Sequence, residues 1–312
     1  MRIIDFSDCE YSSRDGTYGG QAGDKDGIRY QGENWIIKYP KSTKGMDVED
    51  DMSYTTSPLS EFIGSHIYEI LGYDTHQTML GVRNHKIVVA CKDFAAHEGA
   101  LRELRTLKNA SNKELSEILE RSFSSTGSDR MVDVDETLLH LAHNRILSKV
   151  KGVTERFWDC VVIDILINNN DRNNGNWGLL YENGTYCLAP IFDNGAAFSN
   201  KVSEEKVIRI LRQKEILMQS SINIITGYGK DDKQLTARKF LELEYTELND
   251  AIVKNVPLIE EHFTEITDFI NGIPETFQGY NIISPQRKEL YIKSMEIRLQ
   301  HLLIPRLKQI QA

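Results

Sequence analysis

The chain is poor in cysteine: its 312 residues include only Cys9, Cys91, Cys160 and Cys187, and no two of them form a CxxC pair. This scattered spacing indicates neither a zinc site nor a disulfide framework, so we expect a reducing environment. Long apolar runs are missing as well, because no stretch approaches the ~18 consecutive apolar residues of a membrane-spanning helix. We therefore expect no membrane span.

Positive charge is also scarce, and the formal net charge at pH 7 is −9. This balance argues against broad, nonspecific nucleic-acid binding, which needs an excess of lysine and arginine, so we expect no direct nucleic-acid binding. Residues 1–13 are too acidic, and their apolar run is too short, for a signal peptide. We therefore expect a cytoplasmic protein, or one secreted without a conventional signal peptide.

The most informative segment is 170–176, in which Asp171 precedes Asn176 by five positions. Asp193, which begins an Asp-Asn-Gly motif, follows seventeen residues after Asn176. An Asn-Gly pair at 183–184 lies between two apolar runs, which is the strongest short-range signal for a β-hairpin. Because the two ends of a hairpin are adjacent strands, we expect Asn176 and Asp193 to lie close together.

Phosphoryl transfer needs this set of groups. The carboxylate of Asp171 would orient the attacking hydroxyl, while the oxygens of Asn176 and Asp193 would hold Mg²⁺ on the nucleotide phosphates. A calcium loop is the alternative, because Asp171, Asn173 and Glu182 partly match an EF-hand. That loop has glycine at its sixth position and a helix after it. Here the glycine is fifth and a strand is expected next, which favours the kinase interpretation.

The first part of the chain reads as β-rich. A glycine-rich segment at 18–25 precedes a hairpin with a turn at 31–34, and the second strand, 35–39, carries Lys38. A lysine in an apolar strand either reaches nucleotide phosphates or, on an edge strand, prevents pairing with a further strand. The order of loop, strand, turn and lysine-bearing strand is that of a phosphate-covering kinase lobe, which favours the first interpretation. The candidate nucleotide-binding residues of the loop are Gly19, Gly20 and Gln21.

A helix is expected from Ser57, its predicted N-cap, to Leu71, with Gly72 as its stop. Glu61 is the candidate partner of Lys38, although it lies opposite the apolar stripe of this helix. A glutamate in the first turn also favours the helix dipole without a catalytic role, so both interpretations of Glu61 stay open. Three further residues follow the predicted strand 86–90, where backbone groups of a hinge would meet adenine: Lys92, Asp93 and Phe94.

From about residue 95 the pattern is mainly helical. Ser111 and Asp133 each begin an apparent capping box, and the apolar segment 155–168 leads into the Asp171 loop. Further helices are expected at 203–218, 236–255, 258–271 and 285–310. We therefore expect an α+β protein with a two-lobed protein-kinase-like fold, made of a small β-rich N-lobe (1–94) and a larger helical C-lobe (95–312).

With these motifs the chain resembles the HipA-like serine/threonine kinases, in the compact, stand-alone form of that family. The resemblance implies a two-lobed kinase fold, ATP with Mg²⁺, and phosphorylation of serine or threonine in a protein substrate. It also implies that Asp171 is the catalytic aspartate, Asn176 and Asp193 the metal ligands, and Lys38 the phosphate-binding lysine. The segments that carry it are Tyr18–Gly23, Trp35–Lys38, Ser60–Ile67, Asn170–Leu179 and Ala189–Gly195.

Members of this family often autophosphorylate in or near the glycine-rich loop, whereas here Ser12, Ser13 and Thr17 only precede it. HipA toxins carry an additional N-terminal subdomain that contacts a DNA-binding antitoxin, and this chain starts almost directly at the loop, so an antitoxin partner is possible but not implied. The expected function is an ATP- and Mg-dependent protein serine/threonine kinase, of bacterial toxin or effector type. The alternatives are a nucleotide-binding pseudokinase or partner-binding module, and a small-molecule or lipid kinase.

Overall fold

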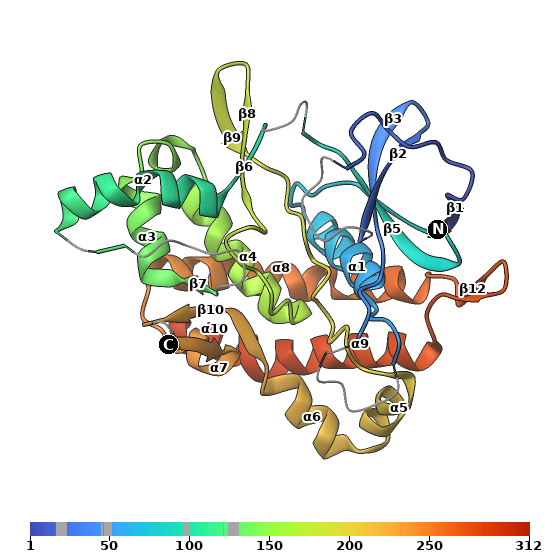
Figure 1. The fold of residues 1–312 in the computed structure, drawn as a ribbon. Coiled ribbons are helices and arrows are strands. Elements are labelled where there is room, and N and C mark those ends of the chain that lie inside the picture. Colours follow the sequence, from blue (N-terminus) through green and yellow to red (C-terminus); the bar gives the residue numbers. More distant parts are fainter. Residues whose placement is uncertain are drawn as a thin grey trace. The chain divides into compact units, whose positions relative to one another are not determined.

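The computed structural model describes residues 1–16, 24–44, 46, 52–95, 100–120, 122–123, 131–231 and 233–312. The predicted glycine-rich loop with Gly19, Gly20 and Gln21 lies outside the described residues. Within them, helices and strands alternate along the chain in an α+β fold, as the sequence predicted (Figure 1).

The chain divides into two compact units, which we describe separately. Unit 1 comprises Met1–Phe94, Asn194–Ser221 and Leu258–Arg298, and unit 2 comprises Ala95–Asp193, Ile222–Pro257 and Leu299–Ala312. The chain first leaves unit 1 and enters unit 2 after Phe94, but two later segments of the chain belong to unit 1 again. As a functional division, an N-lobe of 1–94 and a C-lobe of 95–312 stay a prediction.

A five-stranded sheet forms the first part of unit 1, in the order β1-β4-β5-β3-β2. Strand β1 runs parallel to β4, and the other pairs are antiparallel. The turn between β2 and β3 has two residues, Gln31 (φ 51°) and Gly32 (φ 83°), rather than the predicted four. Positive φ at both positions matches the twist of the flanking strands. The strands are β1 (Ile4–Asp5), β2 (Lys25–Tyr30), β3 (Glu33–Lys38), β4 (Thr78–Arg83) and β5 (Lys86–Lys92).

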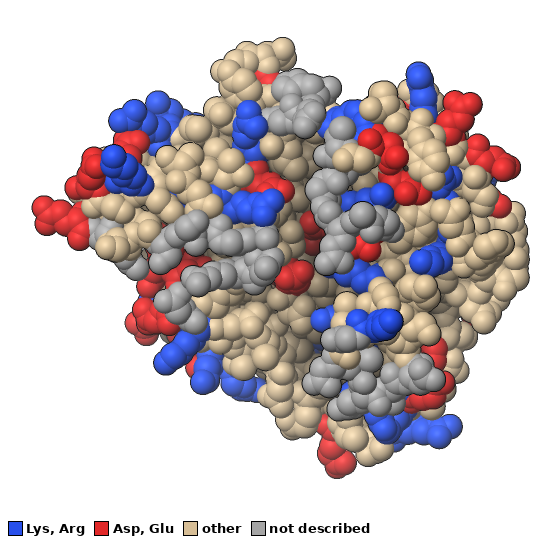
Figure 2. Space-filling view, in the orientation of Figure 1, with Lys and Arg blue, Asp and Glu red and all other residues tan. Residues whose placement is uncertain are grey.

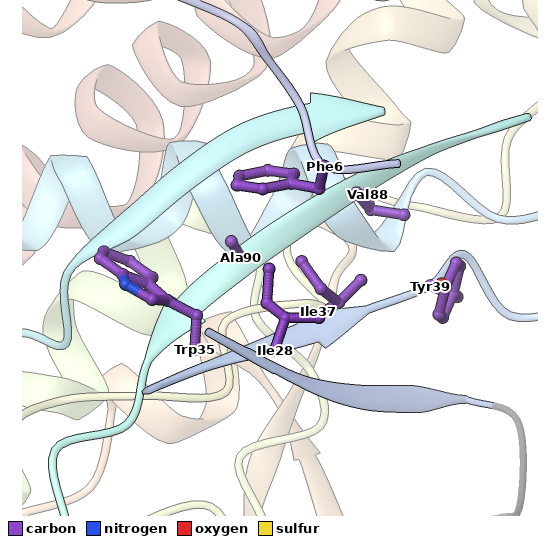
Figure 3. Close-up of a cluster of buried hydrophobic side chains, with 7 residues drawn as sticks. All are labelled: Phe6, Ile28, Trp35, Ile37, Tyr39, Val88 and Ala90. Atoms are coloured by element: carbon purple, nitrogen blue, oxygen red, sulfur yellow. The ribbon is translucent and has the colours of Figure 1, made fainter. Parts of the chain in front are cut away.

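The period of two along β3 decides where Lys38 points. Ile37 joins a buried apolar cluster on one face of the sheet (Figure 3). Lys38, the next residue along β3, therefore points to the other face. Because β3 lies between β5 and β2, it is an inner strand, and the interpretation of Lys38 as an edge-strand lysine is wrong. The cluster consists of Phe6, Ile28, Trp35, Ile37, Tyr39, Val88 and Ala90.

Helix α1 (Ser57–Ile70) packs on β4 and β5 (Figure 1). Its N-cap is Thr56 rather than Ser57, and Gly72 follows its end with φ 79°, as expected of a helix stop. Ten of its fourteen residues are buried. They lie both on the apolar stripe that contains Leu59 and on the opposite side of the helix. Glu61 is therefore buried, even though it lies away from the apolar stripe.

The remainder of unit 1 is mainly helical. The stretch predicted as one helix at 203–218 is two helices separated at Gln213. A buried guanidinium joins two of these helices, because Arg287 Nε of α9 lies 2.5 Å from Glu204 Oε1 of α5. The elements are α5 (Glu204–Arg212), α6 (Lys214–Ile222), the last part of α8 (Thr246–Asn271), β12 (Thr276–Phe277), β13 (Tyr280–Asn281) and α9 (Pro285–Arg298).

Unit 2 contains the predicted hairpin between Asn176 and Asp193. Strands β8 (Gly178–Glu182) and β9 (Thr185–Leu188) pair antiparallel, and both turn residues, Asn183 and Gly184, have positive φ. The sequence did not predict the other strands of this unit. They are β6 (Leu101–Glu103), which pairs with β8, and β7 (Val132–Asp133), β10 (Ile225–Lys230) and β11 (Lys233–Thr236), which form a second sheet in the order β11-β10-β7.

The two predicted capping boxes of unit 2 have opposite outcomes. Asp133 caps α3, accepting a 2.9 Å hydrogen bond from the backbone N–H of Glu136. Ser111 lies inside α2, which begins earlier because Leu104 continues its buried stripe, so the predicted helix start at Ser111 is wrong. The helices are α2 (Leu104–Leu119), α3 (Val134–His143), η1 (Leu147–Lys149), α4 (Val153–Ile167), α7 (Ala237–Leu241), the first part of α8, η2 (Leu299–Leu303) and α10 (Ile304–Gln311).

Helix α8 is continuous through Pro257, so the break predicted between residues 255 and 258 is wrong. The buried side chains of Val256 and Ile259 keep both flanks in the helix. Among the described residues, no helix is long and apolar enough to cross a membrane. On the face drawn in Figure 2, the described acidic and basic side chains are interspersed.

Candidate active site

Asp171 lies in an exposed turn of unit 2, shortly after the end of α4 at Ile167. Its backbone carbonyl accepts hydrogen bonds from the side-chain amides of Asn176, at 2.6 Å, and Asn173, at 3.3 Å. Asn173 Nδ2 also lies 3.4 Å from Asp171 Oδ1, so the loop is held mainly through the Asp171 backbone, and the exposed carboxylate stays accessible. Because Asn176 uses its amide nitrogen in this bond, its side-chain oxygen is the atom available for a cation.

Arg172, the residue after Asp171, organises this part of unit 2. The residue is 1% exposed, and its guanidinium forms a bidentate pair with Asp164 of α4 through Nε and Nη2, both at 2.9 Å. The third nitrogen, Nη1, donates to the carbonyl oxygens of Asn176, at 3.1 Å, and Phe192, at 2.6 Å. One nitrogen thus contacts the backbone at both ends of the hairpin, so Asn176 and the residue before Asp193 are neighbours.

Asp164 itself is 2% exposed and has a further partner in Tyr228 of β10, whose hydroxyl donates to Asp164 Oδ2 at 2.8 Å. Burial, and then the charge of Asp164, hold the pKa of Tyr228 well above its usual value, so the hydroxyl is a neutral donor. Gly227 must be glycine, because a Cβ there would come within 2.7 Å of the Arg172 backbone nitrogen. Sequence analysis missed this network, although one signal was visible: the carboxylate of Asp164 inside the apolar stretch 160–167 of α4.

Asp193 has a backbone φ of 62°, in the left-handed region that aspartate tolerates better than most residues. Such strained positions cluster at functional sites, where the surrounding structure over-determines them. Here the bond from Arg172 to the Phe192 carbonyl fixes the preceding peptide. The oxygens of Asn176 and Asp193 are the hard donors that Mg²⁺ prefers, so the residues present fit that ion.

In unit 1 the structure brings Lys38 and Glu61 together. Lys38 Nζ of β3 lies 3.1 Å from Glu61 Oε2 of α1, and the Glu61 side chain is 2% exposed. Burial alone would raise the pKa of Glu61, but the charge of Lys38 and the hydrogen bond from His76 outweigh it and hold the pKa well below its usual range. The carboxylate is therefore ionised at neutral pH, and Glu61 is not a surface residue that serves the helix dipole.

The three predicted hinge residues end the first segment of unit 1. Lys92 Nζ pairs with Glu33 at 2.7 Å, and Asp93 Oδ2 pairs with Arg14 at 2.5 Å. The N–H groups of Lys92 and Asp93 donate to carbonyls within the unit, at 2.8 and 3.0 Å. A base contact from these two residues would therefore use carbonyl oxygens or side chains. The rings of Phe94 and His76 lie edge to face, with 6.4 Å between their centroids.

The Lys38–Glu61 pair leads to a prediction about kinase activity. We expect Lys38→Ala and Glu61→Ala each to lose activity, and the double variant to lose little more, because residues that act as a unit are strongly non-additive. The measurement is a double-mutant cycle on kcat/KM for ATP. The exposed pair Lys293–Glu289 of α9 is a matched control, whose removal leaves kcat/KM unchanged. Additive losses, or a fully active Glu61→Ala enzyme, would remove Glu61 from the site.

A β-sheet with an inner lysine held by a helix glutamate, and a separate unit with an Asp-x4-Asn loop and a hairpin that leads to Asp193, define a kinase-like protein. No model of a known protein family matches the chain. The serine/threonine-protein kinase CtkA of Helicobacter pylori strain J99 is 30% identical over 314 residues, which cover 96% of this chain and 91% of that protein. The chain belongs to the family of HipA-like serine/threonine kinases.

Solved structures agree with this assignment. The crystal structure of the Helicobacter pylori proinflammatory kinase CtkA matches with a TM-score of 0.83 and 28% identity, over 99% of this chain and 98% of that chain. A chain from the Shewanella oneidensis MR-1 complex of HipA, HipB and operator DNA matches with a TM-score of 0.53 over 95% of this chain and 68% of its own length. At 11% identity this second match shows a shared fold alone.

The predicted kinase class is thereby confirmed: the chain is a HipA-like serine/threonine protein kinase, an enzyme of the phosphotransferase class. Family membership implies, in general terms, a nucleotide, a metal ion and protein substrates. The individual roles of the residues described above stay predictions.

Proposed function

We propose that this kinase transfers the γ-phosphate of ATP, with Mg²⁺, to serine or threonine of a protein. Asp171 accepts the proton of the attacking hydroxyl, Asn176 and Asp193 hold the metal ion, and Lys38, held by Glu61, binds the nucleotide phosphates. Within the predicted nucleotide-binding set, Gly19, Gly20 and Gln21 cover the phosphates, and Lys92, Asp93 and Phe94 contact the base. Bound Mg²⁺ neutralises charge that develops on the transferring phosphoryl group.

One observation supports this proposal most directly. A single guanidinium nitrogen, Arg172 Nη1, contacts the carbonyls of Asn176 and Phe192, while its own backbone continues from Asp171. The backbone that carries Asn176, and the peptide before Asp193, are therefore held by one buried cation of unit 2 that directly follows Asp171. A pseudokinase has no need to keep all three groups together with an ionised Lys38–Glu61 pair, so we prefer an active enzyme.

The direct test is transfer of label from γ-labelled ATP to protein in the presence of Mg²⁺. We expect labelled serine or threonine on the kinase itself or on a generic protein substrate, and none when Mg²⁺ is chelated. Label that appears only on a small molecule or lipid would instead indicate a small-molecule or lipid kinase. No transfer to any acceptor, together with intact nucleotide binding, would support the pseudokinase interpretation.

We expect Mg-ATP to stabilise the folded protein in a thermal melt. Binding to the folded state alone adds about 2.7 kcal/mol at a ligand concentration one hundred times the dissociation constant. Asp193→Asn should reduce the Mg-dependent part of the shift, because it removes a charge but tolerates the positive φ at this position. The absence of any shift at millimolar Mg-ATP would contradict the proposed nucleotide site.

We also infer that autophosphorylation, where it occurs near the glycine-rich loop, falls on Ser13 rather than Ser12. Ser13 is exposed, whereas Ser12 is 8% exposed and its N–H donates to the carbonyl of Gly27 at 2.8 Å. Thr17 lies outside the described residues. We further infer that the kinase acts in the cytoplasm, or is exported without a conventional signal peptide, in the manner of a toxin or effector; an antitoxin partner is possible but not implied.

A further inference from the structure

The carboxylate of Glu61 has a second partner that the proposed function does not use. His76 Nε2 lies 2.9 Å from Glu61 Oε1, while Lys38 Nζ lies 3.1 Å from Oε2. Each carboxylate oxygen therefore has its own partner. The His76 residue is 4% exposed and Glu61 1%, so water does not compete for these contacts to any large extent.

The direction of the His76 bond follows from the ionisation of Glu61. A lone pair on Nε2 at 2.9 Å from a carboxylate oxygen would be repelled, so Nε2 carries a proton and donates it to Glu61. Hydrogen bonds to a charged acceptor are shorter and stronger than neutral ones. His76 thus fixes the rotation of the carboxylate and leaves Oε2 directed at Lys38.

The contacts continue from His76 to the Asp-Asn-Gly motif. Ser65 Oγ of α1 lies 3.1 Å from the same Nε2, as a second acceptor of its N–H, and Asn194 Nδ2 donates to Ser65 Oγ at 3.1 Å. Ser65 is 1% exposed and Asn194 is fully buried. A buried chain of contacts therefore runs from Asn194 through Ser65, His76 and Glu61 to Lys38, and Asn194 is the residue that directly follows Asp193.

The segment that begins with Asn194 is docked on α1 along several residues. A Cβ on Gly195 would come within 3.2 Å of Glu61 Oε2, which explains why glycine stands beside the carboxylate. Ser60 Oγ donates to the carbonyl of Ala197 at 2.7 Å, and the N–H of Thr56, the N-cap of α1, donates to the carbonyl of Asn200 at 2.9 Å. The position of α1, and of Glu61 on it, is thus tied to the segment after Asp193.

We propose that His76 is a positioning residue for the Lys38–Glu61 pair, and that Asn194, acting through Ser65, makes this positioning depend on the docking of segment 194–200. This proposal rests on the proposed function, because it assigns Lys38 to the nucleotide phosphates. It gives the asparagine of the Asp-Asn-Gly motif a role distinct from that of the aspartate. Release of the segment from α1 would free His76 and Glu61, and Lys38 would lose its fixed position.

A metal site is the competing interpretation of the same residues. Ligand atoms of Glu61, His76 and Cys91 lie within 4.8 Å of one another. However, the ammonium of Lys38 contacts the same carboxylate and would repel a divalent cation. The hydrogen bond between His76 and Glu61 also uses the atoms that a metal would need. The geometry therefore points to positioning rather than to metal binding.

The test compares two substitutions of His76. His76→Gln keeps an N–H donor at similar reach, whereas His76→Leu fills the space without a donor. We expect His76→Leu to lower kcat/KM for ATP about 10- to 100-fold, as expected for a misplaced catalytic group, and His76→Gln to restore most of it. His66→Leu, the same change at a histidine of α1 that stacks on Phe269, is the matched control and keeps parental activity.

A second readout does not depend on activity. The rate at which a generic amine acylating reagent modifies Lys38, followed by mass spectrometry, reports how well the ammonium is held. We expect faster modification in His76→Leu, Ser65→Ala and Asn194→Ala, with parental rates in His76→Gln and His66→Leu. The Ser65→Ala/Asn194→Ala double variant should resemble the single variants, because both act on one contact chain.

The outcomes separate this proposal from the proposed function. If the parent protein transfers no phosphate, the proposed function fails, and Lys38 modification alone decides the role of His76. Unchanged Lys38 modification in a folded His76→Leu variant would overturn the positioning role. Equal losses in His76→Gln and His76→Leu would also overturn it. Where His76→Leu does not fold, parental modification rates in Ser65→Ala and Asn194→Ala overturn the coupling to segment 194–200, and faster rates support it.

Discussion

Replacing Asp171 by asparagine should reduce phosphoryl transfer at least about 100-fold, the usual contribution of a positioned general base. Nucleotide binding should remain nearly intact, because the metal ligands Asn176 and Asp193 are unchanged. The local structure should also survive, since asparagine keeps the backbone carbonyl to which Asn173 and Asn176 donate, and also a side-chain oxygen in place of the Oδ1 that Asn173 contacts at 3.4 Å. The measurements are kcat with a protein substrate and the Mg-ATP-dependent thermal shift.

A matched control is available in the same unit. Asp231 is exposed in the turn between β10 and β11, and Asp231→Asn removes one negative charge without touching the loop at 170–176. This control should keep the parental rate and the parental thermal shift. An Asp171→Asn variant that retains the full rate would show that the catalytic role is assigned to the wrong residue.

Replacing Arg172 by leucine should destabilise the protein by about 3–5 kcal/mol, because removal of one partner leaves a buried charge uncompensated. The carboxylate of Asp164, which is 2% exposed, loses its ion-pair partner. The backbone carbonyls of Asn176 and Phe192 lose a hydrogen-bond donor as well. The quantity to measure is the free energy of unfolding from a urea titration. A variant within about 0.5 kcal/mol of the parent, as for an ordinary surface substitution, would contradict this assignment.

Two further variants separate charge from geometry at this position. Arg172→Lys keeps the charge but cannot form the bidentate bond to Asp164 and reach both carbonyls, so we expect an intermediate loss of stability. The double variant Asp164→Leu/Arg172→Leu should cost less than the sum of the single changes, because it removes both buried charges. Both variants should also lower kcat, since they release the backbone on either side of the hairpin.

Local sequence signals predicted the parts of the site that depend on neighbours along the chain. The Asn-Gly pair at 183–184 fixed the hairpin, and Asp133 fixed the start of α3, because turn and cap geometry depends on a few adjacent residues. The apolar strand that carries Lys38 was also visible in the sequence. Whether Lys38 stood on an inner or an edge strand was not, because that depends on pairing with β5, which lies more than fifty positions away.

The parts that the sequence could not supply are long-range contacts. Glu61 was ambiguous because an apolar stripe marks only one side of a helix, whereas α1 is also buried on its polar side. His76 carries no local signal, and the Asp-Asn-Gly motif drew attention to Asp193 rather than to Asn194, since the contacts of His76 and Asn194 are with residues of another element. Ser111 gave a false helix start because the pattern of a capping box also occurs inside a helix, here α2.

The bonds from Arg172 to the carbonyls of Asn176 and Phe192 have a consequence for how ligands bind. The backbone beside both predicted metal ligands is fixed by a protein cation, so its order does not depend on a nucleotide or a metal ion. Preorganisation of this kind lowers the entropy lost when a ligand binds, because fewer groups must be immobilised at that moment. Metal and nucleotide would then exchange without refolding of the hairpin, so refolding would not limit the turnover rate.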